Sequence, residues 1–293
     1  MKAQGGKETA KFIFKEENIM GMVVQHNLTA MNANRQLGIT TGAMAKSTEK
    51  LSSGYRINRA SDDAAGLSIS EKMRNQIRGL DRASANAQDG ISLIQTAEGA
   101  LNESHAILQR MSELCVQAAN DTNMTVDRTA ISEEISQLSQ ELTRISSTTQ
   151  FNKKNLLDGT LSNAQLQIGA NAGQNMAVSI DSTSATALNV TAGEIQVDTH
   201  ENASSSITKV QNAIDTLSSV RSKLGAVQNR LEHTVANLDT TSENTQAAES
   251  RIRDVDMAKE MVSFSKYSIL AQAGQSMLAQ ANGQTSGVLT LLS

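Results

Sequence analysis

The sequence contains no proline and no tryptophan, and aromatic residues make up only 2% of its 293 positions. Proline removes a backbone donor and clashes with the preceding helical turn, so its absence permits long, unbroken helices. Aromatic side chains usually supply much of the bulk of a compact core. Their scarcity favours narrow seams between helices, built from Ala, Leu, Ile, Val and Met.

Groups that commonly carry chemistry are also scarce. The single cysteine, Cys115, excludes an intrachain disulfide framework. The four histidines show no metal-ligand spacing, and we interpret them as packing or surface residues; they are His26, His105, His200 and His233. A formal net charge of −4 gives no electrostatic footprint for nucleic acid. We therefore expect no enzyme activity, no cofactor, no metal and no nucleic-acid partner.

The two ends of the chain differ from each other in composition. Residues 1–21 are rich in Lys, Glu and Gly and contain no apolar run that could serve as a secretory signal. We predict that they are a non-native extension, with Met20 or Met22 as the true start, or else a disordered arm. Residues 267–293 carry no charge, but amide side chains punctuate them throughout. Because a bilayer penalises amides, we expect a helix buried against protein and no membrane insertion.

Apolar residues recur every seven positions along most of the chain. The residues of this repeat are Leu37, Met44 and Leu51, then Leu80, Ile94, Leu101 and Leu108, and later Leu217, Leu224 and Leu231. Leu270, Met277 and Leu278 follow at helical spacing in the last segment. Such spacing predicts coiled-coil-like seams, and we expect them to serve as assembly seams in a chain that packs against itself and against further copies. The alternative, core helices of a globular bundle, fits the length of the repeat less well.

The middle of the chain changes character. Polar and apolar residues alternate in 164–168 and 176–180, with Gly169 to Gly173 between them, which predicts a β-hairpin near 164–180. Residues 181–204 form a short segment that we expect to be irregular or weakly stranded, and helix should resume near Ser206. The predicted fold class is mainly α: a long antiparallel coiled-coil-like rod of paired N- and C-terminal segments with a small β-hairpin insert.

Several short stretches closely resemble the ends of bacterial flagellins. They are LSSGYRIN at 51–58, DDAAGL at 62–67, NAQDGIS at 86–92, AEGALNE at 97–103, LAQAG at 270–274 and LAQAN at 278–282. The resemblance covers residues 22–293 and lacks the large variable outer domains of many flagellins. It implies an inner terminal-helix domain of 22–62 with 254–293. It also implies a helical rod domain of 63–253, in which 181–204 is the variable segment.

The resemblance further implies a function and partners. The chain would polymerise into the flagellar filament for swimming motility, outside the cell, after type III export without a cleaved signal peptide. Its partners would be further copies of itself, an export chaperone, the filament cap, hook-junction proteins and a vertebrate Toll-like receptor. A hook–filament junction protein and a soluble coiled-coil scaffold are the alternatives.

Receptor contact would fall on three residues by the same resemblance: Arg110, Leu114 and Glu134. Arg110 offers a planar, permanently charged group suited to an interface, and Leu114 could insert into a pocket. The local sequence departs from the commonest family pattern at Ser112, which replaces a basic residue, and at Cys115, which replaces a small aliphatic one.

Overall fold

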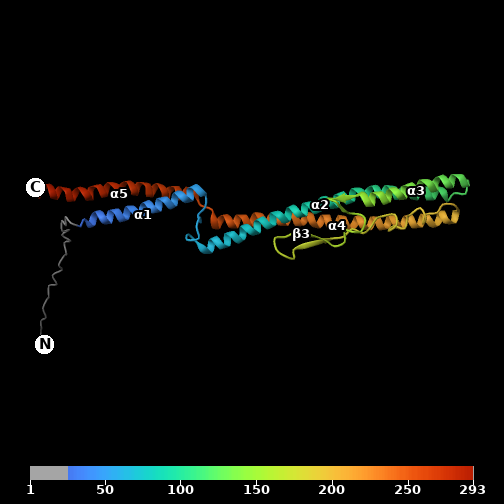
Figure 1. Ribbon diagram of the computed structural model, residues 1–293, viewed down its shortest axis with the longest axis horizontal. Helices are drawn as coiled ribbons and strands as arrows, with labels where there is room; N and C mark the ends of the chain where they lie inside the picture. Colours follow the sequence, from blue (N-terminus) through green and yellow to red (C-terminus); the bar gives the residue numbers. More distant parts are fainter. Residues whose placement is uncertain (1–25, 293) are drawn as a thin grey trace, which may run out of the picture. The chain divides into compact units, whose positions relative to one another are not determined.

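The computed structural model describes residues 26–292, with side chains through Gln284, and Figure 1 shows the order of its elements. The predicted extension 1–21 lies outside the described residues. The chain forms two compact units, one made of the part up to Asp62 together with Asp254–Ser293, and one made of Asp63–Arg253. We call them unit 1 and unit 2. Within the described part, no helix combines the length and hydropathy needed to span a bilayer.

Unit 1 is an antiparallel pair of helices, α1 (Leu28–Ser53) and α5 (Met257–Leu292) (Figure 1). The helix α1 ends at Gly54, whose φ of 74° is a left-handed conformation that glycine adopts without a Cβ clash. The Gly54 carbonyl then accepts a hydrogen bond of 3.0 Å from the Val255 backbone. At the other end of the pair, the Asn27 side chain donates to the Ala281 carbonyl at 2.8 Å. Polar contacts therefore tie the two helices together at both ends.

Unit 2 is built on two long helices, α2 (Ala64–Ala118) and α4 (His200–Arg253), which run antiparallel side by side (Figure 1). Asp63 caps the start of α2 by accepting a 2.8 Å hydrogen bond from the Gly66 backbone. A third helix, α3 (Thr125–Thr148), packs against α2. The mainly helical fold class and the antiparallel rod are confirmed.

Two short antiparallel ribbons interrupt the helices. The strands β3 (Ala164–Gln167) and β4 (Asn175–Val178) pair at the predicted hairpin. A smaller ribbon, β1 (Gln150–Phe151) with β2 (Lys154–Asn155), was not predicted. It turns through Asn152 and Lys153, whose φ values are 48° and 63°. Two successive left-handed residues are typical of the tightest hairpin turn, but lysine is a rare occupant and gives no sequence signal.

The segment between β4 and α4 is irregular, as expected, but it is also part of the core. Val190, Ile195 and Val197 are at most 2% exposed and belong to the main hydrophobic cluster of unit 2. The helix α4 begins at His200 and not near Ser206. The Thr199 hydroxyl accepts a hydrogen bond from the Asn202 backbone at 3.2 Å, so a polar cap sets the start before the apolar repeat begins.

Candidate assembly surface and receptor-contact residues

The seam inside unit 1 is lined by small residues. Ala271 and Ala281 are 7% and 5% exposed, and a Cβ added at Gly274 would lie 3.3 Å from the Leu37 side chain. The predicted seam residues Leu37, Met44, Leu51 and Leu278 are half-buried. Small residues let two helix backbones approach closely, which places the paired face of α5 along Ala271, Gly274 and Ala281.

The predicted seam residues Leu270 and Met277 lie elsewhere. They are 45% and 59% exposed, so they are less well covered than the other predicted seam residues of unit 1. Successive residues of a helix are rotated by about 100°. Val262 and Ile269 therefore fall on the side of α5 opposite Ala271, whereas Leu270 and Met277 lie within about 40° of Ala281, at the edge of the paired face. We call these four exposed residues, which span an arc of about 100°, the outer face of α5.

Exposed apolar side chains are concentrated in unit 1. Nine of the thirteen large hydrophobic residues that are exposed in the described part of the chain belong to it. They are Leu28, Met31, Ile39, Met257, Met261, Val262, Ile269, Leu270 and Met277. Apolar side chains exposed in such number on one pair of helices are typical of a surface that packs against other protein.

The seam of unit 2 is closed instead. Its predicted residues are all buried at 6% exposure or less: Leu80, Ile94, Leu101, Leu108, Leu217, Leu224 and Leu231. They come from α2 and α4 and, apart from Leu80, join one hydrophobic cluster. Leu80 packs in a second, small cluster with Ala83 and Leu238. These residues hold unit 2 together and are not available to another subunit.

Two of the three receptor candidates lie at the surface and bind each other. Arg110 on α2 donates through Nε to Glu134 on α3 at 3.0 Å and through Nη1 to Glu113 at 3.2 Å. The hydrogen bond to Glu134, and then the one to Glu113, raises the pKa of Arg110. Arg110 and Glu134 are about half exposed, at 50% and 45% of their side chains. This pair therefore offers a charged surface group of fixed geometry.

Leu114 requires a correction. Its side chain is 2% exposed and belongs to the core cluster of unit 2. A side chain that is occupied by internal packing cannot insert into a pocket of a partner without opening the core. In this conformation Leu114 can affect a receptor only by supporting the part of α2 that carries Arg110.

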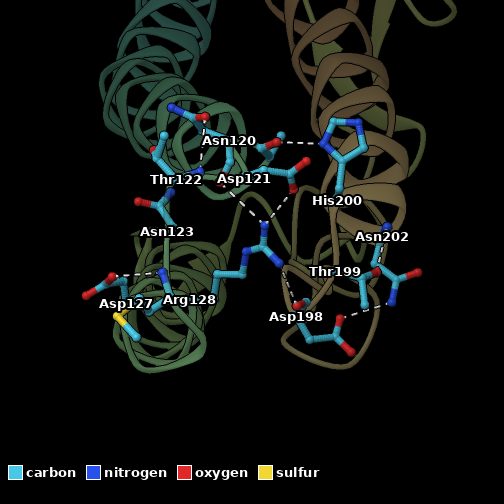
Figure 2. A network of polar contacts seen from close by, with 12 residues as sticks. Asn120, Asp121, Thr122, Asn123, Asp127, Arg128, Asp198, Thr199, His200 and Asn202 are labelled. Carbon is cyan, nitrogen blue, oxygen red and sulfur yellow. Dashed lines mark hydrogen bonds and ion pairs between the residues drawn. The ribbon is translucent and has the colours of Figure 1, made fainter.

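A polar network joins three helix ends in unit 2, and sequence reasoning did not find it (Figure 2). Arg128 of α3 donates to the carbonyls of Asp198 at 3.3 Å and Asn120 at 3.4 Å, and it forms an ion pair with Asp121 at 3.3 Å. His200 at the start of α4 lies 2.6 Å from the Ala119 carbonyl. Because a carbonyl oxygen only accepts, Nδ1 of His200 must carry the hydrogen. The network fixes the ends of α2, α3 and α4 relative to one another.

The described residues contain no grouping of three or more His, Cys, Asp or Glu side chains that could hold a metal ion. Cys115 is fully buried, and burial raises the pKa of its thiol to about 11. The thiol therefore stays protonated at neutral pH and is a poor nucleophile.

Comparison with known proteins gives consistent matches. The family model described as bacterial flagellin N-terminal helical region matches residues 24–162, and the one described as bacterial flagellin C-terminal helical region matches residues 207–292. A flagellin of Halalkalibacterium halodurans is 57% identical over 271 residues, covering 92% of this chain and all of that protein. A flagellin of Bacillus subtilis is 51% identical over 303 residues, with the same coverage.

A solved structure gives a more distant match. It comes from Vibrio parahaemolyticus and is described as a flagellar hook-associated protein. The TM-score is 0.55 at 12% identity, and the match covers 66% of this chain and 100% of that one. Identity at this level shows a shared fold alone, whereas the two flagellins match over their whole length at more than 50%. The hook–filament junction alternative is therefore the weaker one.

One closed helical unit and one unit with open apolar faces define a structural subunit that packs against copies of itself. The chain belongs to the bacterial flagellin family, in a form without a large outer domain. It is a subunit that polymerises into the extracellular flagellar filament used for swimming motility. Flagellins are a family of structural proteins.

Proposed function

We propose that unit 1 is the principal contact of this subunit with its neighbours and forms the inner layer of the filament. The observation that supports this proposal is the concentration of exposed apolar side chains on α1 and α5. Burial of apolar surface yields roughly 25 cal/mol per Å². The exposed Val, Ile, Leu and Met side chains of α1 and α5 are the surface that such a contact would cover.

A matched pair of substitutions tests this role. Val262 in unit 1 and Val126 in unit 2 are 71% and 78% exposed, so Val→Lys disturbs the free subunit equally little at either position. Val262→Lys should raise the critical concentration for polymerisation, because it places an ammonium group in an apolar contact. Val126→Lys should leave it closer to the wild-type value. Sedimentation of filaments from purified subunits measures both, and equal effects of the two substitutions would contradict the proposal.

The same exposed apolar surface bears on how the subunit is exported and delivered to the filament. A subunit with an apolar outer face on α5 needs that face shielded before assembly, which supports a dedicated export chaperone that binds α5. The subunit would leave through the flagellar type III apparatus without a cleaved signal, and cap and hook-junction proteins would receive it at the tip and base of the filament. Deleting residues 257–293 should abolish chaperone capture in a co-purification assay; unchanged capture would place the chaperone site elsewhere.

Recognition by a vertebrate Toll-like receptor is a further proposal, centred on Arg110 and Glu134. Their pairing at 3.0 Å presents a planar guanidinium that is held in one orientation. Arg110→Ala should weaken a receptor-driven reporter response by more than tenfold, a loss of the order found for an interface anchor. Arg144→Ala on α3 removes a similar exposed pair with Glu141 and serves as the control. Equal responses to the two variants would argue against the site.

A further inference from the structure

The chain contains few side chains that mild oxidants attack, and most of them are methionines. It has twelve methionines, one cysteine and no tryptophan. The Cys115 thiol is buried and stays protonated, since burial raises its pKa to about 11. Oxidation favours thiolates that solvent can reach. Accessible thioether sulfurs are therefore the oxidisable groups that the folded subunit presents.

Burial sorts the methionines of the described chain into distinct classes. Met111 and Met176 lie in the core of unit 2 and are 0% and 6% exposed. Five others are exposed. Four of these lie in unit 1, namely Met31 at 65%, Met257 at 47%, Met261 at 50% and Met277 at 59%, and the fifth is Met124 of unit 2 at 73%. Four of the nine exposed large hydrophobics of unit 1 are thus methionines.

We propose that Met31, Met257, Met261 and Met277 are modification sites at which a peroxide controls polymerisation. Each sulfur takes one oxygen from the peroxide: an S–O bond forms, the O–O bond breaks and water leaves. The sulfur loses two electrons and the peroxide gains them. The free subunit exposes these sulfurs, and packing against other copies would cover them. This inference rests on the proposed role of unit 1 as the subunit contact.

Oxidation changes the character of the surface on which assembly depends. Methionine is flexible and apolar, whereas its sulfoxide carries a strong hydrogen-bond acceptor. The exposed apolar residues of α5 nearest to Met277 are Ile269 and Leu270, whose side chains have no donor to pair with that oxygen. A buried polar group left without a partner opposes association. We expect each sulfoxide held in the contact to raise the critical concentration about tenfold, the factor that corresponds to 1.4 kcal/mol.

The first experiment compares free subunits with intact filaments under the same dose of hydrogen peroxide. Peptide mapping by mass spectrometry follows the sulfoxide at each methionine. In free subunits the four sites should oxidise at rates close to Met124, while Met111 stays unmodified. In filaments the four sites should be at least several-fold slower. If they oxidise equally fast in filaments, unit 1 is not the covered contact, and the proposed function fails with this inference.

The second experiment tests control of assembly directly. Oxidised wild-type subunits should polymerise poorly, and treatment with methionine sulfoxide reductases should restore assembly. The four-leucine variant combines Met31→Leu, Met257→Leu, Met261→Leu and Met277→Leu. These substitutions preserve volume and apolarity, so the variant should polymerise before and after peroxide. Met124→Leu should stay sensitive.

The outcomes of the second experiment distinguish the proposed oxidation control from the proposed role of unit 1 as the subunit contact. If filaments protect the four methionines but oxidised wild type assembles normally, the modification inference is overturned and the contact remains. If the four-leucine variant loses assembly as completely as wild type after peroxide, the sensitive group lies elsewhere and the inference is again overturned. Restoration by reductase, together with resistance of the four-leucine variant, supports it.

Discussion

The β3–β4 hairpin docks on α2 at a position where a side chain has no room, and this predicts the effect of a single methyl group. A Cβ built at Gly79 would lie 2.8 Å from the Ala170 Cβ and 3.2 Å from its Cα. Carbon atoms in contact prefer about 3.5–4.0 Å, so the hairpin must move by about 1 Å. Neither atom of Ala170 can rotate away. We expect the clash in Gly79→Ala to cost about 1–3 kcal/mol, as overpacked cores do.

A second glycine in the same helix isolates that cost. A Cβ at Gly99 would meet nothing within 4 Å, so Gly99→Ala should stabilise unit 2 by about 1 kcal/mol through helix propensity alone. Both substitutions gain the same propensity, and the difference between them measures the clash. Urea unfolding of the free subunit, followed by circular dichroism, gives the two midpoints. Ala170→Gly should recover part of the loss in Gly79→Ala. Equal midpoints for the two Ala variants would refute the described docking.

Three further predictions concern unit 2. Leu108→Ala removes a side chain that is 0% exposed and should cost about 2–5 kcal/mol in urea unfolding, whereas exposed Gln109→Ala should change stability by less than about 0.5 kcal/mol. Cys115 should not react with a thiol reagent at pH 8 in the native subunit and should react after unfolding, because burial raises its pKa to about 11; native labelling would contradict this. Hydrogen bonds from Thr160 lower the pKa of Asp158, so its contribution is present above the unfolded pKa of about 3.9 and is lost as pH falls through the folded value. The destabilisation caused by Asp158→Ala should therefore shrink between pH 7 and pH 3, and a constant effect would contradict the assignment.

Much of unit 2 could be predicted because its apolar repeat fits only one arrangement, a helix with one apolar stripe that is covered by another helix. Ile94, Leu101 and Leu108 recur every seven residues, and a helix places them on one stripe that must be covered. The returning repeat at Leu217 and Leu224 supplies the cover. Burial of all five confirms that periodicity alone identifies the partners of such a seam.

Periodicity was insufficient in α5, because this helix is apolar on several sides. Leu270 and Met277 belong to the same heptad spacing, yet the face that meets α1 carries Ala271, Gly274 and Ala281. Small residues permit close approach of the two backbones, and Leu270 and Met277 remain largely exposed beside that face. The sequence pattern contains both the large apolar residues and the small ones, and it does not show which of them meet α1.

Other features depend on contacts far apart in the sequence. Arg128 and Asp198 are 70 positions apart, and only the meeting of α3 with the start of α4 brings them together. Leu114 lies beside the heptad stripe of α2, and its burial could not be derived from that repeat alone. Burial by distant parts of the chain leaves no local signal in the sequence. The resemblance named both Arg110 and Leu114 as receptor contacts, and only the structure shows that Arg110 is half exposed and Leu114 is buried.

The composition of the two seams explains why one unit is closed and the other open. In unit 2 the seam buries Leu and Ile side chains, each worth roughly 1.5–3 kcal/mol when fully covered. In the described part of α1 and α5, the buried residues are Ser47, Ala271 and Ala281. An Ala methyl contributes about 0.8 kcal/mol, less than the roughly 1–2 kcal/mol needed to fix one residue of backbone. Beyond these three, the seam between two helices of 26 and 36 residues has only half-buried large side chains such as Leu37 and Leu278. On the proposed role of unit 1, the exposed Val, Ile, Leu and Met residues supply further stabilisation where other copies cover them.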